Sequence, residues 1–331
     1  MPPAIAEAIH LVFSDSAMGQ LLRAGAKRVR IHGSGDALTS GPCDVDPVRH
    51  EKLRDAWDIE TGWPSLSHRL TLERLRATIA GDAPVVLWGT RAFSDLVWLW
   101  WALDGLRRVG AEGPRFFLAR PHPDDPLTGC GGSTPDEVRV ALAAARPISD
   151  DEWREGAELW LEYASSSPVA FDEARRHGSK AFPELTGSAE LHGAWFPRLN
   201  DGRLRLSELD EVLLGSVGES WRSASDLLAA LPEDQVAPLV RPYADLFPRY
   251  RLRAWAARGV LEHQEVDDEN PWEQDRFRAT DRSRALLDQG LGNVGDAPQL
   301  YVGGCLVNDL ASPWIRVESD GGWRLALHAR S

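Results

Sequence analysis

Three short polar segments in the N-terminal third of the chain lie at the ends of predicted strands and carry side chains suited to binding or catalysis. They are Ser14-Asp15-Ser16 after IHLVF, His32-Gly33-Ser34-Gly35-Asp36 after RVRI, and Gly89-Thr90-Arg91 after VVLW. Aspartates can hold an amine, a metal ion or a ribose hydroxyl, and an arginine can neutralise a phosphate or a carboxylate. Glycines let a ligand approach the backbone closely.

The elements around these segments alternate between strand and helix periodicity, which predicts a parallel sheet with helices on its faces. We expect strands over 9–13, 28–32, 84–88 and 115–119, and helices over 16–25, 47–58, 65–80 and 93–109. In such a sheet, ligands bind beyond the carboxyl ends of the strands. The sequence therefore predicts one shared site there. Its candidate catalytic residues are Asp15 and Asp36, and its candidate ligand-binding residues are Ser14, Ser16, His32, Gly33, Ser34, Gly35 and Arg91.

A structural role is the alternative for the same residues. Ser14 or Asp15 can cap the helix that follows, and Gly33 and Gly35 can shape a turn. Three polar residues in a row exceed what one cap needs, and a helix start also offers unpaired N–H groups to an anion. We therefore expect Ser14 and Ser16 to contact a ligand's acceptor atoms. Asp15 should face a hydroxyl, an amine, a metal ion or Arg91.

The pattern changes after residue 121. Helices are predicted over 134–146 and 149–164, and shorter ones within 168–195. From 206 onward three helices, over 206–217, 223–231 and 238–258, precede two strands that flank a polar loop, an order typical of a winged helix. We therefore predict an α/β protein with three parts: an α/β domain over 1–125, a helical connector over 126–204, and a winged-helix-like α+β domain with C-terminal strands over 205–331.

The third predicted helix of the winged-helix-like domain carries arginines that could face DNA. They are Arg249, Arg251, Arg253 and Arg258, in or next to the element that enters a major groove in DNA-binding members. The predicted wing, EHQEVDDENPWEQD, is acidic, and the whole chain has a net charge of −13. Phosphates repel both, so the charge pattern disfavours DNA and leaves a protein partner open.

Composition and cysteine usage indicate a soluble cytoplasmic protein without a membrane partner. Cys43, Cys130 and Cys305 are far apart and form no Cys-x-x-Cys pair, which argues against a disulfide framework or a thiolate zinc site. The most apolar segment, 84–106, is interrupted by Arg91, Asp95 and Asp104. We read it as a buried strand and a buried helix whose tryptophans pack in the core, since a membrane span would lack these charges.

The segment RPHPDDPLTGCGG resembles the metal motif of zinc-dependent N-deacetylases. That resemblance would make His122 and Asp125 zinc ligands and Asp124 the base. However, Pro126 stands where an acidic residue is expected, and no His-x-x-His pair follows to complete three ligands. We therefore predict no metal site, and the sequence names no cofactor.

Several segments together resemble the bacterial family catalogued as domain of unknown function 1835. They are IHLVFSDSAMGQLL, GDALTSGP with RDAW, VVLWGTRAFSDLVWLWWALDGL, ELWLEYASSSPVAF, PRLNDGRLRLSELDEVLL and YVGGCLV with SPWIRV. The resemblance covers nearly the whole chain and implies a layout without an established reaction. This chain departs from it twice: Ser14 replaces a glycine, and Gly89-Thr90-Arg91-Ala92 replaces a cluster of an acidic residue, His and Asp.

Two classes of function remain open on the sequence. The first is a small-molecule-binding protein or enzyme acting on a polar ligand, phosphorylated and nucleotide-like molecules included, at the strand-end crevice. The second is a non-catalytic regulatory or assembly protein that contacts a protein partner through the winged helix, with DNA the less favoured partner.

Overall fold

The computed structural model describes residues 2–61, 69–122, 125, 128–231, 246–267, 269, 271–309, 313–319 and 322–328. The chain forms two compact units, Met1–Ala189 and Glu190–Ser331, which we call unit 1 and unit 2. The domain boundaries predicted near 125 and 205 stay predictions. Within the described ranges, no helix has the length and apolarity needed to cross a membrane.

Unit 1 is built on a five-stranded sheet of order β2-β1-β3-β4-β5. The first four strands are parallel, and β5 pairs antiparallel with β4. The parallel α/β sheet predicted from the sequence is confirmed. The strands are β1 Ile9–Phe13, β2 Ile31–Ser34, β3 Val85–Trp88, β4 Phe116–Ala119 and β5 Arg146–Pro147. The strand predicted over 28–32 starts only at Ile31, because Arg28–Arg30 form a turn of 3-10 helix, η1.

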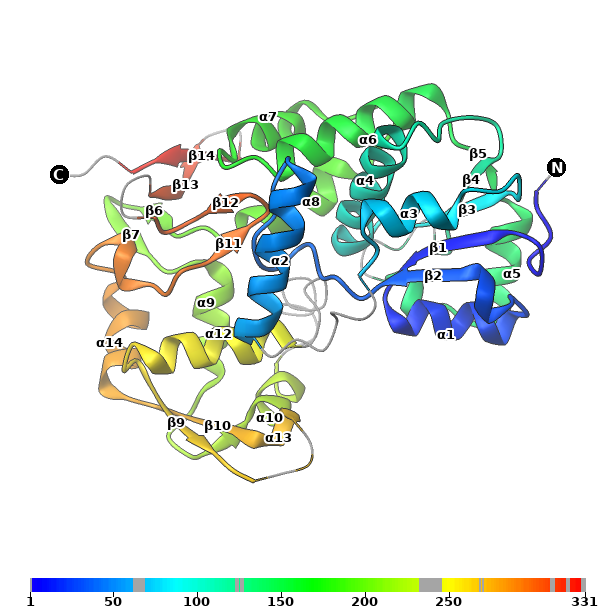
Figure 1. Ribbon diagram of the computed structural model, residues 1–331. Helices are drawn as coiled ribbons and strands as arrows, with labels where there is room; N and C mark the ends of the chain where they lie inside the picture. The colour runs from blue at the N-terminus through cyan, green and yellow to red at the C-terminus, as the bar shows by residue number, and fades with distance from the viewer. Residues whose placement is uncertain are drawn as a thin grey trace. The chain divides into compact units, whose positions relative to one another are not determined.

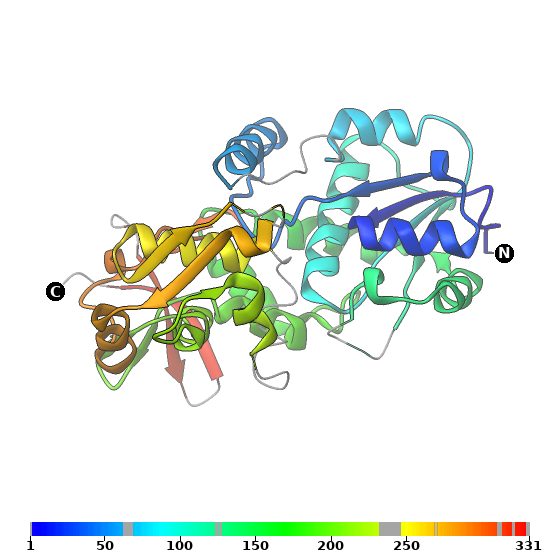
Figure 2. The same cartoon turned by 90° about the horizontal axis from the view of Figure 1, so that it is seen from below.

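Helices cover both faces of this sheet (Figure 1). The helices that begin in unit 1 are α1 Asp15–Ala24, α2 Pro47–Thr61, α3 Leu72–Thr78, α4 Phe93–Arg108, η3 Cys130–Gly132, α5 Pro135–Ala143, α6 Asp150–Tyr163, α7 Val169–His177 and α8 Leu185–Gly193, the last of which continues into unit 2. Helices α1 and α5 pack on one face through a cluster that includes Val12, Val86 and Leu21. Helix α6 lies on the other face, where Trp153 meets Phe116 edge-on at 5.5 Å. Figure 2 shows α1 from a second direction, beside β1 and β2.

The order of the strands places a topological switch between β1 and β3. From β1 the chain passes through α1 to β2 on one side, and from β3 it passes through α4 to β4 on the other. The loops that follow β1 and β3 therefore leave the sheet in opposite directions. In open α/β sheets, this divergence creates the crevice in which ligands bind.

The described residues of unit 2 form three small sheets, of order β14-β13-β6-β7, β8-β10-β9 and β11-β12. The strands are β6 Arg198–Asn200, β7 Arg203–Arg205, β8 Arg222–Ser223, β9 Leu261–Glu265, β10 Asp275–Ala279, β11 Tyr301–Val302, β12 Cys305–Leu306, β13 Trp314–Ser319 and β14 Gly322–Leu327. The helices are α9 Glu208–Ser216, α10 Ala224–Ala229, α12 Leu246–Ala257, α13 Pro271–Gln274, α14 Asp281–Gln289 and the 3-10 turn η5 Val294–Asp296.

The helices predicted over 206–217, 223–231 and 238–258 correspond to α9, α10 and α12, although residues 232–245 lie outside the described part of the chain. The structure adds the short strand β8 between α9 and α10, which the sequence did not predict. The described elements thus run α9, β8, α10, α12, β9, β10, and their strands form one sheet in which β10 lies between β8 and β9.

Candidate functional site

Ser14 joins the end of β1 to the start of α1 and closes one side of the switch. Its Oγ accepts a hydrogen bond from the Ala17 N–H at 3.3 Å, which caps the helix. Its own N–H donates to the Ser34 carbonyl oxygen at 3.1 Å and so ties the ends of β1 and β2 together. The φ angle of Ser14 is 76°, a left-handed conformation that is strained for any residue with a Cβ atom.

The chain's own backbone covers the N-terminus of α1. A Cβ atom added at Gly131, in η3, would lie 2.9 Å from the Ser16 Cβ and 3.3 Å from the Ser14 Oγ, so only glycine fits there without a shift. The η3 turn therefore packs against the start of α1, where the sequence predicts that Ser14 and Ser16 contact a ligand, but Ser14 is only half-buried and Ser16 stays exposed.

Asp95, in the first turn of α4, anchors the η3 turn. Its Oδ2 accepts from the Cys130 N–H and from the Thr90 hydroxyl, each at 2.9 Å. Burial raises the pKa of the Asp95 carboxyl, and these hydrogen bonds offset part of the rise. Thr90 also accepts from the Ala92 N–H at 3.1 Å, so it helps to start α4. The polar residues after β3 are thus used to hold the loop together.

A buried ion-pair network lies beyond the carboxyl end of β2. Asp36 and Arg54 are 2% and 1% exposed and pair directly, and the Arg69 Nε lies 3.1 Å from the Asp36 Oδ2. Arg69 also pairs with the buried Asp58 and with the exposed carboxylate of Asp55. Burial alone would raise the pKa of the Asp36 carboxyl, but the two guanidiniums more than offset it and hold this pKa below its usual value.

Helix α2 supplies half of this network through an inverted amphipathic pattern. Its buried face carries His50, Arg54 and Asp58 beside Trp57, whereas Ile59 on the outside is 74% exposed. Charged residues normally turn to solvent and apolar ones inward. The Gly41 backbone packs so closely on this face that a Cβ there would lie 2.7 Å from an Arg54 nitrogen. This inversion is what places charged groups under the adjacent pocket.

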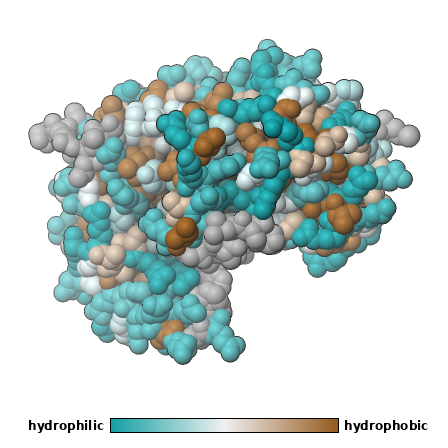
Figure 3. All heavy atoms as spheres, in the orientation of Figure 1, coloured by the Kyte–Doolittle hydropathy of each residue, from teal (hydrophilic) through white to brown (hydrophobic). Residues whose placement is uncertain are grey.

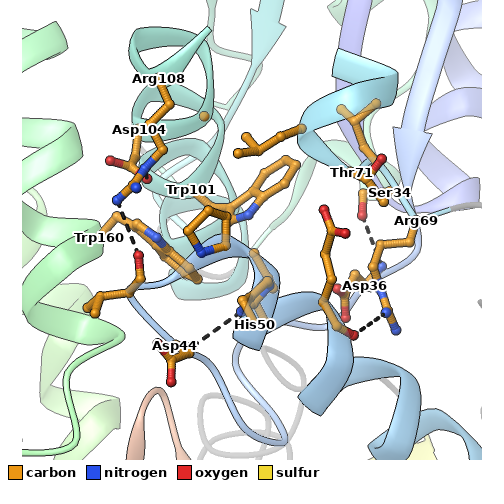
Figure 4. A pocket seen from close by; sticks show the side chains of 17 residues that line it. Ser34, Asp36, Asp44, His50, Arg69, Thr71, Trp101, Asp104, Arg108 and Trp160 are labelled. Carbon is orange, nitrogen blue, oxygen red and sulfur yellow. Dashed lines mark hydrogen bonds and ion pairs between the residues drawn. The ribbon is translucent and has the colours of Figure 1, made fainter. Parts of the chain in front are cut away.

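The pocket above this network, which we call the strand-end pocket, lies between the β2–α2 loop and helices α3, α4 and α6 (Figure 4). Figure 4 shows the Asp36–Arg69 pair on one side and the Asp104–Arg108 pair on the other, with Trp101 and His50 between them. The lining residues are Ser34, Asp36, Leu38, Asp44, Val45, Pro47, His50, Glu51, Arg69, Leu70, Thr71, Leu72, Trp101, Asp104, Gly105, Arg108 and Trp160. Its interior of about 20 Å³ has room for about one water molecule.

Two of the lining residues, Trp101 and His50, have properties that matter for chemistry. Trp98 and Trp100 are fully buried in the core as predicted, whereas Trp101 is half-buried and faces the pocket. Burial lowers the pKa of His50 to about 4, so this imidazole is neutral at neutral pH. Its Nδ1 lies 3.3 Å from the Asp44 N–H, which makes Nδ1 the acceptor and leaves the proton on Nε2.

The other residues predicted for the site are spread over the sheet edge. Ser34 and Asp36 line the strand-end pocket, and the Ser34 Oγ accepts from the Asp36 N–H at 3.3 Å. His32 and Gly33 line a different pocket, beside α3. Asp15 is exposed, and Gly35 and Arg91 are half-buried; no pocket that we identify among the described residues includes them.

Sequence reasoning missed several residues that the structure brings to the strand-end pocket. His50 and Arg54 sit in a charged helical stretch that is typical of a solvated face, and Arg69 and Asp104 lie in segments without a motif. One feature of the sequence could have indicated these residues: Val48 and Ile59 lie on the face of α2 opposite to His50 and Arg54. Both apolar side chains are strongly exposed in the structure. This feature becomes recognisable only once the orientation of the helix is known.

The structure provides no donor set for a metal in its described part. No group of three or more His, Cys, Asp or Glu side chains is placed there to hold a metal ion. The His122 Nε2 lies 3.7 Å from the Glu137 carboxylate, and the Asp125 Oδ1 accepts from the Thr128 N–H at 3.3 Å. Asp124 lies outside the described residues.

The cysteine thiols are unsuited to nucleophilic chemistry at neutral pH. All three are buried and free. Burial raises the pKa of Cys43 to about 12 and that of Cys130 well above its usual value. The thiolate is the nucleophilic form, so these residues are packing groups.

In unit 2, the arginines predicted to face DNA are engaged within the chain. Arg251 is buried, pairs with Asp210 at 2.7 Å and donates to the Pro298 carbonyl oxygen at 2.9 Å. Arg249 and Arg253 both pair with the fully buried Asp275 of β10. Arg258 donates to the Gly295 carbonyl oxygen at 2.7 Å.

No protein-family model matches the chain, and a search of curated proteins finds no match either. The resemblance to the domain of unknown function 1835 family therefore stays a prediction.

Proposed function

We propose that unit 1 binds a small polar molecule at the strand-end pocket, as a binding protein or as an enzyme. The observation that carries this proposal is the buried charged face of α2. Replacing a buried ion-pair network by apolar residues of similar size is often neutral or stabilising, so stability alone does not favour Asp36, Arg54 and Arg69. A network that orients polar groups toward a ligand accounts for their presence.

The chemistry of the lining favours a hydroxyl or an amine as the inserted group. The interior admits an object of about one water molecule, and the carboxylates of Asp44 and Asp104 can accept hydrogen bonds from it. The Nε2–H of His50 can donate one. Trp101 and Trp160 supply apolar walls for the rest of the ligand. A sugar hydroxyl of a nucleotide-like ligand meets these requirements.

Binding is better supported than acid–base catalysis by the described groups. Both oxygens of Asp36 face guanidiniums and its pKa is held low, which makes it a weak base. Asp15, the other candidate catalytic residue, is exposed. Acid–base catalysis would therefore need a reactive group on the ligand itself or a side chain at the mouth of the pocket.

A thermal-shift screen of cellular metabolites tests this proposal. A ligand at 100 times its dissociation constant stabilises the fold by about 2.7 kcal/mol. The informative variant is Asp104→Asn, which keeps the side-chain size and removes a carboxylate of the pocket. Its control is Asp151→Asn, since Asp151 also pairs with an arginine one helical turn along its own helix, but is 59% exposed on α6 and does not line the pocket. Loss of the ligand-induced shift in Asp104→Asn alone supports the site, whereas equal shifts in both variants place the ligand elsewhere.

We propose as a second function that unit 2 carries a winged helix that contacts a protein partner. The order α9, β8, α10, α12, β9, β10 and the central position of β10 resemble the arrangement of a winged helix, which supports the proposal. The surface over β9 and β10 is mostly hydrophilic (Figure 3), and Glu262 and Glu265 of β9 are exposed. Glu262 pairs with Arg278, and Glu265 lies 3.6 Å from Arg253. Both carboxylates would repel the phosphates of DNA, which favours a basic protein surface as the partner.

Charge reversal on β9 tests the second proposal. The double variant Glu262→Lys, Glu265→Lys should lose a partner that the parent captures from its native cell extract, while Glu219→Lys, at another exposed glutamate of unit 2, should keep it. Capture that is equal for both variants would argue against this surface.

We also propose a reducing, cytoplasmic location, which is supported by three free and buried thiols.

A further inference from the structure

A second pocket of unit 1, with a volume of about 280 Å³, lies between the edge strand β2 and helix α3. We call it the basic pocket. Its lining residues are Met18, Arg28, Ile31, His32, Gly33, Arg69, Leu70, Arg74, Ala77 and Thr78. Three of them are arginines and one is a histidine, and no aspartate or glutamate is among these described residues. Arg69 already pairs with Asp36, Asp55 and Asp58 from outside the lining, so the case for an anion rests on Arg28 and Arg74. In a chain with a net charge of −13, such a lining is a local exception that attracts anions.

Backbone carbonyl groups hold two of the arginines beside the pocket. The Arg28 Nη1 donates to the Ile31 carbonyl oxygen at 3.3 Å, and the Arg74 Nη1 donates to the Arg69 carbonyl oxygen at 2.9 Å. No carboxylate of a described residue lies within ion-pair distance of Arg28. A carbonyl oxygen orients a guanidinium without cancelling its charge. Arg28 therefore keeps its full positive charge for a ligand.

His32 and Thr78 add neutral hydrogen-bonding groups to the same lining. The His32 Nδ1 lies 3.3 Å from the Thr78 Oγ1, so the two side chains face each other across the pocket's edge. Burial lowers the pKa of His32, and the charge of Arg28 lowers it further. The Arg28 guanidinium therefore lies close enough to His32 to disfavour a second positive charge on the imidazole.

We propose that the basic pocket binds the phosphate group of a small molecule, held by Arg28 and Arg74. Guanidiniums donate in a planar fork that matches phosphate oxygens, and a phosphate monoester has both the charge and the acceptor number to engage several donors. The Thr78 hydroxyl can donate to a remaining oxygen. The pocket is larger than a phosphate ion, which leaves space for part of the organic group.

This inference goes beyond the function proposed for the strand-end pocket. The two pockets share Arg69 and Leu70, but their remaining lining residues differ and their charge is opposite in character. Neither Asp104 nor Trp101 lines the basic pocket. A variant that abolishes binding in one pocket therefore leaves the other intact, so the two proposals can fail separately.

Titration of the full chain with inorganic phosphate, followed by calorimetry at constant ionic strength, tests the proposal. Phosphate should bind saturably, and acetate more weakly, because acetate has one charge and two acceptor oxygens. Arg28→Gln should weaken phosphate binding by at least about tenfold, since a hydrogen bond between charged groups is lost. Arg28 is exposed, so this variant is expected to fold like the parent.

The matched control is Arg30→Gln, which removes the same charge from the same turn of η1 but at a residue that does not line the pocket. It should bind phosphate within about twofold of the parent, because salt screens charges outside the site. Equal weakening by Arg28→Gln and Arg30→Gln would overturn the proposal in favour of diffuse attraction. So would phosphate and acetate binding with equal affinity, or phosphate failing to bind at all.

Discussion

The Arg54 guanidinium and the Asp36 carboxylate form an ion pair in which both side chains are almost completely removed from water. Arg54 also donates to the Ser40 carbonyl oxygen, and so links α2 to the loop that follows β2. Asp36 also pairs with Arg69, and Arg69 in turn pairs with the buried Asp58. Two buried arginines and two buried aspartates thus balance each other, and the balance depends on all four.

Asp36→Asn should destabilise unit 1 strongly. The substitution leaves two buried guanidiniums short of one countercharge, and removing one partner of a buried pair typically costs about 3–5 kcal/mol. Asp15→Asn, at an exposed residue, should leave the free energy of unfolding unchanged within about 0.5 kcal/mol. Urea denaturation of both variants measures the difference. Equal midpoints would mean that the network does not support the fold.

Ser14 should tolerate glycine better than alanine. Both substitutions remove the cap on the Ala17 N–H, but only glycine relieves the strain of a φ angle of 76°. Loss of the cap costs about 1 kcal/mol for alanine and only a few tenths for glycine. We expect Ser14→Gly to unfold with a free energy close to that of the parent, and Ser14→Ala about 1–2 kcal/mol below it. Thermal melts in which alanine matches glycine would contradict this order.

Stability should fall as the pH drops from about 6.5 towards 4, in part because of His50. The unfolded histidine takes up a proton near its ordinary pKa of 6.5, whereas burial holds the folded pKa at about 4. Between these values the unfolded state binds more protons, so acidification favours unfolding. The full difference corresponds to about 3 kcal/mol. Chemical denaturation across this pH range should show a shallower slope for His50→Gln, and an unchanged slope would exclude His50 as a contributor.

Unit 2 should not bind duplex DNA through α12. Arg249, Arg251 and Arg253 are each paired with a carboxylate, so releasing them for phosphates would cost the pairs that they already form. Fluorescence anisotropy with a labelled duplex at low salt should show no saturable binding at micromolar protein. Saturable binding that weakens steeply with salt and is lost in Arg253→Gln would contradict this expectation. The parallel measurement on Arg284→Gln, at an exposed arginine outside α12, controls for general charge.

The amino-acid sequence by itself determined the parallel sheet and most of its helices. Runs such as VVLW, and helical periods such as that over 93–109, are local patterns whose burial follows from their own composition. Helix α1 begins at Asp15 with Ser14 as its cap, one residue before the predicted start at 16, and the sequence left open whether Ser14 or Asp15 would be the cap. Strands of two or three residues, such as β7 and β8, were not predictable, because their pairing partners rather than their composition define them.

Only the tertiary structure decided how the polar residues at the sheet edge are used. The sequence places Ser14 and Asp36 at neighbouring strand ends, but it does not show that Gly131 covers the first or that two arginines enclose the second. Burying a charge is costly unless countercharges surround it, and those countercharges come from α2 and from residue 69. From its sequence alone, the charged helix α2 is therefore expected to face solvent. Its actual orientation is set by contacts with Asp36 and Arg69, which are distant in the sequence and leave no trace in the local periodicity of the helix.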